Sequence, residues 1–438
     1  MAEQESTQPR FFTGTAPGRL DVMGGFADYS GSLVLQMALR EHTNVSLRLR
    51  NDPVCTLLSE TTDGQLSTTV DFRQLLLDGM PDYNTALNYF SARKNQRWAS
   101  YVLGCVLVLM KEKGMTFSGA DFRIHSAVPP AKGVSSSAAL EVATMRALCQ
   151  ACNITLQGSE TAQLAQKAEN LVAGAPCGIM DQLSSCFGRQ GHLLPITCQP
   201  DQMGEMIPVP EGLFFAGLDS GVRHAVSGSS YGAVRAAAFM GYTIIAQALG
   251  VDRRTIERFR ESGQRSLLPF GGYLCNIPVG EFSDRFLGML PEQISGMEFQ
   301  KAYGETTDTV TTIDPEAVYK VRTCALHPVL EHQRVQRFME LISMPDDGEG
   351  IRDRELGSLM AAAHLGYSDC GIGSRRTDEI VAMSRKGFDG LIIGAKITGG
   401  GSGGTVCFLV RGEDGLGAIA EIRERMQKRH KTTLRLFE

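Results

Sequence analysis

The sequence predicts an α+β protein of two domains with mixed sheets, on three observations. At 438 residues the chain is long for a single hydrophobic core. Apolar residues alternate with polar ones over 32–50, as in strands, whereas their spacing over 98–111 is that of a helix. Between 200 and 215 the composition loosens into polar residues with Gly and Pro, so we place a boundary there, between domains at 1–210 and 211–438.

The same patterns place the individual elements. In the first half, strands are expected at 32–50, 53–72 (two strands around a turn at Asp63-Gly64), 117–128, 193–196 and 213–218, and helices at 98–111, 140–148 and 161–172. Residues 1–12 read as a loose tail, 15–25 as a loop with a short apolar segment, 79–97 as irregular, and 180–187 as a turn or short helix. The second half predicts helices at 232–249, 315–344, 353–366 and 376–385, and strands at 391–397 and 404–411.

Composition narrows the class of protein. The net charge of −5 is spread without long runs, which argues against a nucleic-acid partner. No apolar run reaches the roughly 18 residues of a membrane span, and the N-terminus is polar, so no membrane partner is expected. The 11 Cys are scattered, and Cys149-x-x-Cys152 has no second pair beside it, so reduced, core-facing thiols are expected rather than zinc. We expect a cytoplasmic protein that is a monomer or a weak homodimer.

A serine-rich stretch is the first candidate for function. Pro129-Pro130 ends the preceding element, and Gly133 and three consecutive serines lead into a helix-forming run. The start of a helix favours an anion, and phosphate is the usual one. An ordinary Ser-capped helix is the alternative, and on this stretch alone the two are equally favoured.

Three further stretches suggest ligand contacts. The glycine-rich segment 395–405 lies between two expected strands, and its backbone N–H groups could hold an anion, although a flexible hairpin loop is the alternative and a P-loop is excluded. Asp181 follows a glycine-containing break, as a catalytic carboxylate or as a helix cap. The polar segment 220–231 could line a cleft or lie on the surface. Separate glycine-rich loops and a candidate base together suggest phosphoryl transfer.

Four motifs in order resemble the GHMP family of sugar kinases, in its galactokinase-like branch. The segment Gly18-Arg-Leu-Asp-Val-Met-Gly-Gly-Phe-Ala-Asp-Tyr29 is similar to the galactokinase signature GR-x-N-[LI]-[IM]-GEHTDY. The segment 133–139, Gly-Val-Ser-Ser-Ser-Ala-Ala, resembles the second motif, and 396–404 resembles the third. Pro176-Cys-Gly-Ile-Met-Asp-Gln182 matches galactokinases closely. The resemblance covers residues 13–412 and implies the two-domain GHMP kinase fold, with the active site in the cleft between the domains.

The resemblance also implies a role for each matched residue. Asp181 would act as the base, or orient the C1 hydroxyl, with Arg19 beside it. Sugar would be bound by Asp28 and Tyr231, with Gly25 and Phe26 in the same site. ATP would be held by Gly133, Ser135, Ser136, Ser137, Gly400 and Gly401, with Lys132 either reaching phosphate or staying in solvent. Trp98 and Tyr101 would pack near adenine, although core aromatics of a helix are as well supported. Ser137 and Glu169 match the residues that hold Mg²⁺ in this family.

The departure from the signature carries the substrate expectation. Gly25-Phe26-Ala27 stands where galactokinases have Glu-His-Thr, so polar partners of the sugar, including the one near the exocyclic C6 hydroxyl, are lost. An unpaired buried hydroxyl costs on the order of 1–3 kcal/mol. We therefore expect L-arabinose, which is D-galactose without C6, to be phosphorylated to L-arabinose 1-phosphate. The amino-acid sequence around the first two motifs also resembles the kinase portion of plant L-arabinokinases.

The sequence leaves other functions open. A galactokinase is one, and a kinase for galacturonate or another uronic acid is a second, in which Arg40 or Lys132 would have to meet the C6 carboxylate. A sugar-sensing regulator without catalysis and a mevalonate-type kinase are further alternatives. Exchanging Gly25 for Glu and Phe26 for His is expected to move the preference toward galactose.

Overall fold

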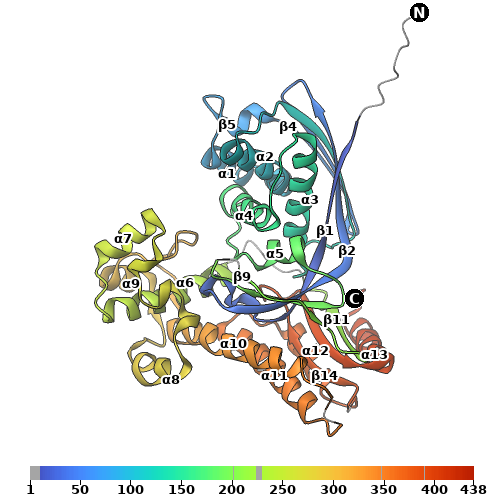
Figure 1. The fold of residues 1–438 in the computed structure, drawn as a ribbon, viewed down its shortest axis with the longest axis vertical. Coiled ribbons are helices and arrows are strands. Elements are labelled where there is room, and N and C mark those ends of the chain that lie inside the picture. Colours follow the sequence, from blue (N-terminus) through green and yellow to red (C-terminus); the bar gives the residue numbers. More distant parts are fainter. Residues whose placement is uncertain (1–9, 201, 223–228, 347, 389) are drawn as a thin grey trace, which may run out of the picture.

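Two sheets organise the molecule, which a computed structural model describes over residues 10–438 except 201, 223–228, 347 and 389 (Figure 1). The larger sheet has the strand order β10-β8-β2-β7-β3-β4, with β1 paired to β2 and β9 to β8. Its strands are β1 (Phe12–Met23), β2 (Leu33–Arg50), β3 (Val54–Thr61), β4 (Gly64–Asp71), β7 (Gly119–Ser126), β8 (His192–Thr197), β9 (Gln202–Met203) and β10 (Ile207–Pro208). Most pairs are antiparallel, but β3 and β7 are parallel, so the sheet is mixed.

Helices cover the inner face of this sheet in the upper part of Figure 1. They are α1 (Tyr83–Ser91), α2 (Ser100–Lys113), α3 (Ser136–Ala151), α4 (Gly158–Ala168) and α5 (Met180–Phe187). Alternate side chains of β2, such as Val45 and Leu47, point into this layer, and they pack with Leu103, Val106 and Val142 in one buried cluster. A short hairpin of β5 (Leu76–Leu77) and β6 (Met80–Pro81) lies beside α1.

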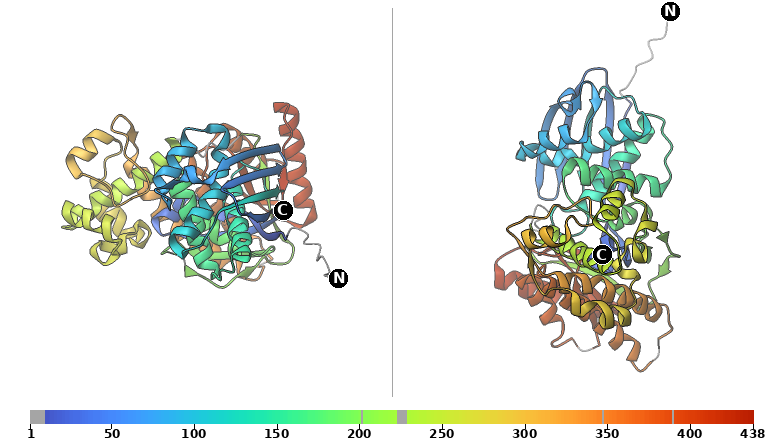
Figure 2. Two further views of the ribbon diagram at one scale, coloured as in Figure 1. Left: turned by 90° about the horizontal axis from the view of Figure 1, so that it is seen from above. Right: turned by 90° about the vertical axis from the view of Figure 1, so that its left-hand side faces the viewer.

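The second half builds on a smaller sheet of order β14-β15-β11-β16. These strands are β11 (Leu213–Asp219), β14 (Ile392–Ile397), β15 (Thr405–Arg411) and β16 (Leu436–Phe437), and the helices packed with them are α10 (Val321–Ile342), α11 (Ile351–Cys370), α12 (Arg375–Ser384) and α13 (Gly412–His430). The long α6 (Ser229–Ala248) leads into a helical lobe that projects to one side (Figure 2). The lobe contains α7 (Arg253–Ser262), α8 (Val279–Glu281), α9 (Gly296–Tyr303) and the pair β12 (Ile294–Ser295) and β13 (Val318–Tyr319).

The expected α+β class with mixed sheets is confirmed, and the two sheets meet through β1 and β2. Leu20 and Leu35 of the larger sheet share a buried cluster with Leu409 of the smaller sheet and with Phe338 and Leu356 of the helices behind it. The first sheet ends at Pro208 and the second begins at Leu213. The division into domains at 1–210 and 211–438 stays a prediction. Within the described ranges, no helix combines the length and apolar character needed to cross a membrane.

Several elements, among them α7 and α9 of the lobe, differ from the sequence expectations. Residues 15–25 were expected as a loop, but most of them belong to β1, which is buried on both faces from Ala16 onward and so shows no alternation. The irregular segment 79–97 contains α1, whose first turn is capped by Asp82 accepting a hydrogen bond from the Thr85 N–H at 2.7 Å. The sequence pattern also missed α13, whose glycine-rich start has low helix propensity but whose Ile422 and Met426 are buried.

Candidate functional site

An ion pair between a buried arginine and a partly exposed aspartate lies where the two sheets meet. Arg19 of β1 donates from Nε and Nη2 to Oδ1 of Asp181, at 2.9 and 2.7 Å. No hydrogen bond within the described part of the chain reaches Oδ2. The pair lines a cavity of about 100 Å³, together with Phe26, Asp28, Gly133, Ser135, Ser136, Ser137, Glu169, Tyr231 and Gly400. Sequence-predicted residues from six separate segments of the chain therefore line one cavity.

Arg19 is fully ionised despite its burial. Burial opposes its charge, but the carboxylates of Asp181 and Asp21 outweigh this, and the pKa of Arg19 is raised above its ordinary value. A further nitrogen, Nη1, donates to the Gly133 carbonyl at 2.7 Å. One side chain thus fixes both the Asp181 carboxylate and the serine-rich loop.

The serine at the start of α3 does not cap the helix, and other segments hold the serine-rich loop in place. Ser135 precedes α3 with φ of 56° and makes no capping hydrogen bond, and its buried hydroxyl has no partner among the described residues. The alternative of an ordinary Ser-capped helix is therefore wrong. The loop is fixed instead by the Arg19 N–H, which donates to the Val134 carbonyl at 3.1 Å, and by the Thr405 hydroxyl, which donates to the Lys132 carbonyl at 2.8 Å. The free N–H groups of the first turn of α3 are suited to an anion.

A second cavity, of about 470 Å³, adjoins the first across this loop. Ala131, Ser136 and Ser137 line both cavities. The remaining lining is largely apolar and includes Trp98, Tyr101, Leu66, Ile124, Val128, Pro130 and Leu140. Trp98 also packs partly against the first buried core cluster, so the two alternatives for this residue, cavity lining and core packing, coexist. A small polar cavity and a larger apolar one thus meet at the anion-binding loop.

Buried carboxylates surround the small cavity. Burial and the nearby charge of Asp181 raise the pKa of Asp28 to about 7 and that of Glu169 to about 7. Burial also raises the pKa of Glu141 well above its ordinary value. Gln182 donates to Glu169 at 2.6 Å and to Glu141 at 3.2 Å. Sequence reasoning did not single out Glu141 or Gln182, because nothing in the pattern marked them as buried.

The donor set at Ser137 and Glu169 suits Mg²⁺. Glu169 lies on a π-helical turn, and the Ser137 hydroxyl hydrogen-bonds to its carboxylate. One hydroxyl and one carboxylate in a carboxylate-rich site, open to further oxygen ligands, match the way Mg²⁺ is usually held. Among the described residues, no group of three or more His, Cys, Asp or Glu forms a denser metal site. The residues therefore fit this ion and not a cage built from protein ligands alone.

The third motif is tied to the first by a buried network. Lys396 is fully buried and donates to Oδ2 of Asp21 at 2.8 Å. The Thr398 hydroxyl accepts from the Asp21 N–H at 2.8 Å and donates to the Asp21 carbonyl at 2.9 Å. Gly400 lines the small cavity, whereas the backbone of Gly401 packs against Ile372 and Tyr367. The signal for this network was present in the sequence, since Asp21 stands where the galactokinase signature has Asn.

Asp28 and the loop before α5 are fitted to each other. A Cβ on Gly178 would lie 1.7 Å from Oδ2 of Asp28, so only glycine allows this approach. Arg235 of α6 donates to the Cys177 carbonyl at 3.1 Å and forms a buried ion pair with Asp308 at 2.9 Å. Arg235 and Asp308 thus position this loop, and no sequence motif marks either residue.

Two basic residues, Lys132 and Arg40, form ion pairs that the sequence analysis did not consider for them. The Lys132 ammonium lies 2.8 Å from the Asp219 carboxylate, so it neither lines the small cavity nor extends into solvent. Arg40 is exposed and faces Glu438 at 3.3 Å. Of the segment 220–231, Tyr231 lines the small cavity, whereas residues 223–228 lie outside the described residues.

Asp28 gives a testable pH dependence. Between about pH 4 and 7, folded Asp28 holds a proton that the unfolded chain has released, so this group lowers the free energy of unfolding as pH rises, by at most about 1.4 kcal/mol per pH unit. We expect Asp28→Asn to become progressively more stable than the wild type across this window. Urea unfolding at pH 5, 6, 7 and 8 measures the difference, and a difference independent of pH would contradict the raised pKa.

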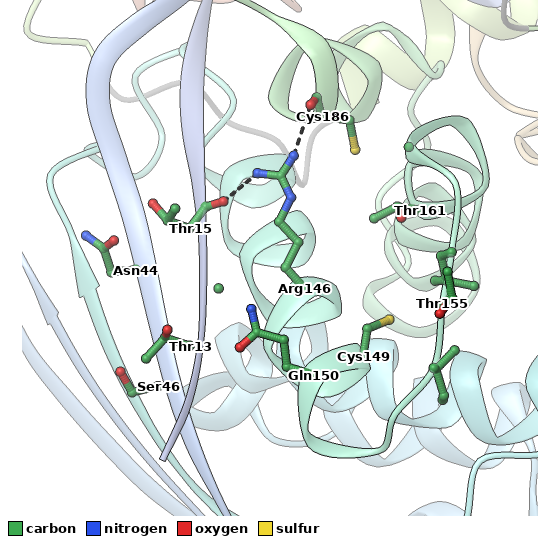
Figure 3. Close-up of a pocket in the computed structure, with 14 residues that line it drawn as sticks. Thr13, Thr15, Asn44, Ser46, Arg146, Cys149, Gln150, Thr155, Thr161 and Cys186 are labelled. Carbon is green, nitrogen blue, oxygen red and sulfur yellow. Dashed lines mark hydrogen bonds between the residues drawn. The ribbon is translucent and has the colours of Figure 1, made fainter. Parts of the chain in front are cut away.

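A larger cavity, of about 870 Å³, lies elsewhere (Figure 3). It flanks β1 at Thr13 and Thr15 and includes Cys149 and Gln150 of α3. Arg146 crosses it and donates to the carbonyls of Thr15, at 2.5 Å, and Cys186, at 2.9 Å. It shares no lining residue with the cavity around Arg19. This cavity is therefore separate from the predicted catalytic residues.

Comparisons with known proteins agree with the sequence resemblance. Residues 100–189 match the GHMP kinases N terminal domain, and residues 3–49 match the galactokinase galactose-binding signature. The chain is 37% identical to an L-arabinokinase of Arabidopsis thaliana over 97% of this chain and 45% of that protein. It is 30% identical to a galactokinase of Chloroflexus aggregans, over 91% of this chain and 83% of that protein.

A solved structure supports the fold. The galactokinase of Lactococcus lactis, crystallised with galactose, superimposes with a TM-score of 0.71 at 20% identity, over 98% of this chain and 92% of that chain. A mevalonate kinase from Methanococcus jannaschii gives a lower TM-score of 0.55 at 14% identity. The chain spans less than half of the A. thaliana protein but most of the C. aggregans galactokinase.

Proposed function

The chain belongs to the GHMP kinase family of ATP-dependent kinases, among its galactokinase-like sugar kinases, and we propose that it transfers the γ-phosphate of ATP to the anomeric C1 hydroxyl of L-arabinose. One observation carries the proposal: the Arg19–Asp181 pair lies in a small cavity that meets a larger apolar cavity at the open serine-rich loop. Sugar would occupy the first cavity, adenosine the second, and the phosphates the loop between them.

In the proposed reaction, Asp181 receives the sugar hydroxyl. Arg19 holds Oδ1, which leaves Oδ2 to accept the hydrogen bond and then the proton of the C1 hydroxyl. The guanidinium of Arg19 stabilises the developing negative charge on that oxygen. The oxygen forms its bond to the γ-phosphorus as the bond to the β–γ bridging oxygen breaks, and ADP leaves.

The other matched residues bind and position the reactants. Asp28 and Tyr231 would accept and donate hydrogen bonds to sugar hydroxyls. The first turn of α3 and the backbone near Gly133 and Gly400 would hold the phosphates. Mg²⁺ held by Ser137 and Glu169 would offset the charge of the phosphates. Because Lys132 is already paired with Asp219, a phosphate contact from it requires that this pair break.

The cavity favours a neutral sugar without a hydroxymethyl group. Phe26 is fully buried and presents an apolar surface in the lining, where a C6 hydroxyl would lack a partner. A uronic acid would need a cation near its carboxylate, but Arg40 and Lys132 are both engaged elsewhere. Among the described lining residues, Arg19 is the sole cation, and Asp181 already neutralises it.

A screen of ADP release tests the proposed reaction. L-arabinose, D-galactose, D-galacturonate and D-glucuronate are supplied with ATP and Mg²⁺, and kcat/KM is expected to be at least roughly tenfold higher for L-arabinose than for D-galactose. Comparable values for the two sugars would refute the substrate assignment and leave a galactokinase. Binding of sugar and ATP without phosphate transfer to any of them would make the protein a sugar-sensing regulator.

The single tryptophan offers a test of the nucleotide site. Trp98 is the one Trp of the chain, and it lines the apolar cavity. We expect ATP to change its fluorescence saturably without sugar, because a base stacked in that cavity alters the surroundings of the indole. Leu66→Arg, at the same cavity, is expected to weaken this response, since it replaces an apolar side chain of the lining with a charged one. An unchanged spectrum at saturating ATP would place adenine elsewhere.

A further inference from the structure

We propose that Tyr367 determines the sugar preference of this site, because it fills the space that a side chain at position 25 would need and supports Phe26 against the cavity. The inference rests on the proposed function and deepens it. The preference would belong to a packed cluster drawn from distant segments of the chain, and not to Gly25-Phe26-Ala27 alone.

Gly25 and Tyr367 exclude each other's side chains. Gly25 follows β1 with φ of +45°, and a Cβ built on it would lie 2.0 Å from the Tyr367 hydroxyl oxygen and 2.8 Å from Cζ. No real Cβ approaches other atoms so closely. The galactokinase signature has Glu at this position. A chain that keeps Tyr367 therefore has no room for that Glu.

Tyr367 cannot swing aside to make room. It lies on α11 and is fully buried. Its hydroxyl donates to the Gly399 carbonyl at 2.7 Å and lies 3.5 Å from Oδ2 of Asp21. Turning the ring out would leave that hydroxyl and the glycine-rich loop without these partners. The block at position 25 is therefore rigid.

The same ring supports Phe26. Phe26 stacks on His327 of α10 with ring centroids 4.1 Å apart and an interplanar angle of 7°. Tyr367 meets Phe26 edge-on, at 4.8 Å and 77°. Phe26 is thus held on two sides, and it is the member of this cluster that lines the cavity. Such contacts fix a single rotamer, so the apolar wall keeps its place.

This changes the expectation drawn from the sequence. Gly25→Glu with Phe26→His was expected to move the preference toward galactose, but with Tyr367 present the new Glu collides with the Tyr ring at its first carbon. The exchange requires Tyr367 to be shortened as well.

Thermal unfolding tests the steric part without reference to activity. Gly25→Ala is expected to lower Tm by roughly 5 °C or more, and the same substitution in a Tyr367→Ala background by less than half as much. Tyr367→Phe should give only partial relief, because it removes the 2.0 Å contact with the hydroxyl oxygen but leaves the ring carbon Cζ at 2.8 Å. Gly24→Ala is the matched control: Gly24 also has positive φ, but its Cβ would meet Val34 at 2.6 Å, so Tyr367→Ala should not help it. An equal Tm loss for Gly25→Ala in both backgrounds would overturn the proposal.

Turnover tests the specificity part. The ratio of kcat/KM for D-galactose to that for L-arabinose is compared in the wild type, in Gly25→Glu/Phe26→His, and in the same pair with Tyr367→Ala. We expect the pair alone to lose activity on both sugars, and the triple variant to raise the ratio at least roughly tenfold over wild type. An equal rise without the Tyr367 change would overturn the role of Tyr367. If the double or triple variant does not fold, the Tm comparison of Gly25→Ala with and without Tyr367→Ala tests the proposal alone. If the wild type phosphorylates neither sugar, the proposed function fails, but the Tm comparison still tests the contact between Gly25 and Tyr367.

Discussion

Asp181→Asn is expected to lower kcat by about 10²–10⁴-fold, with the KM for sugar changed only a few-fold. The amide keeps the shape of the carboxylate and can still accept a bond from Arg19, but it cannot take the proton of the C1 hydroxyl. The loss therefore falls on the chemical step. Initial rates of ADP release at saturating ATP measure it, and the Trp98 fluorescence response shows whether ATP still binds.

The matched control for this variant is Asp121→Asn. Asp121 also accepts hydrogen bonds from arginines, Arg48 at 2.6 Å and Arg50 at 3.0 Å, but it lies on β7 and lines neither site cavity. Its replacement should leave kcat within about twofold of wild type. A loss of less than about tenfold for Asp181→Asn, with the fold intact by circular dichroism, would mean that another group accepts the proton.

Breaking the Asp21–Lys396 pair is expected to destabilise the protein by about 3–5 kcal/mol. Both side chains are fully buried, and Lys396→Met would leave the Asp21 carboxylate without its cation. Asp21→Asn alone would leave the Lys396 ammonium without its anion. The double variant should lose much less than the sum of the two, because no uncompensated charge remains. Urea unfolding of the four proteins gives the coupling free energy.

An exposed ion pair serves as the control for the stability loss of the Asp21 and Lys396 variants. Glu292 lies 3.0 Å from Arg322 but is 82% exposed, so Glu292→Gln should cost at most about 1 kcal/mol. Additive losses for the Asp21 and Lys396 variants would show that the pair does not hold the first and third motifs together. A coupled loss together with reduced kcat would tie the network to the site, since Asp21 also accepts from Gln36 and from the Gly25 N–H, and Gly25 precedes Phe26.

The larger elements could be predicted from the sequence because each carries a local pattern. The alternation in 32–50 became β2, and the helical spacing of 98–111 became most of α2. The pattern failed where burial is two-sided, as in β1, or where glycine opens a helix, as in α13. Tertiary packing stabilises both elements, and no window of local sequence contains that information.

The sequence by itself determined which residues could perform the chemistry, since Arg19, Asp28, the serines and Asp181 stand in motifs and Glu169 matches a family position outside them. Tertiary structure decided how those residues are held and what surrounds them. It paired Lys132 with Asp219, left Ser135 uncapped, and placed Tyr367, from α11, against Gly25. The physical reason is that excluded volume and buried charge act between residues hundreds of positions apart, where sequence spacing carries no signal. The Gly25 departure was visible in the sequence, and the Tyr367 ring occupies the space that a side chain there would need.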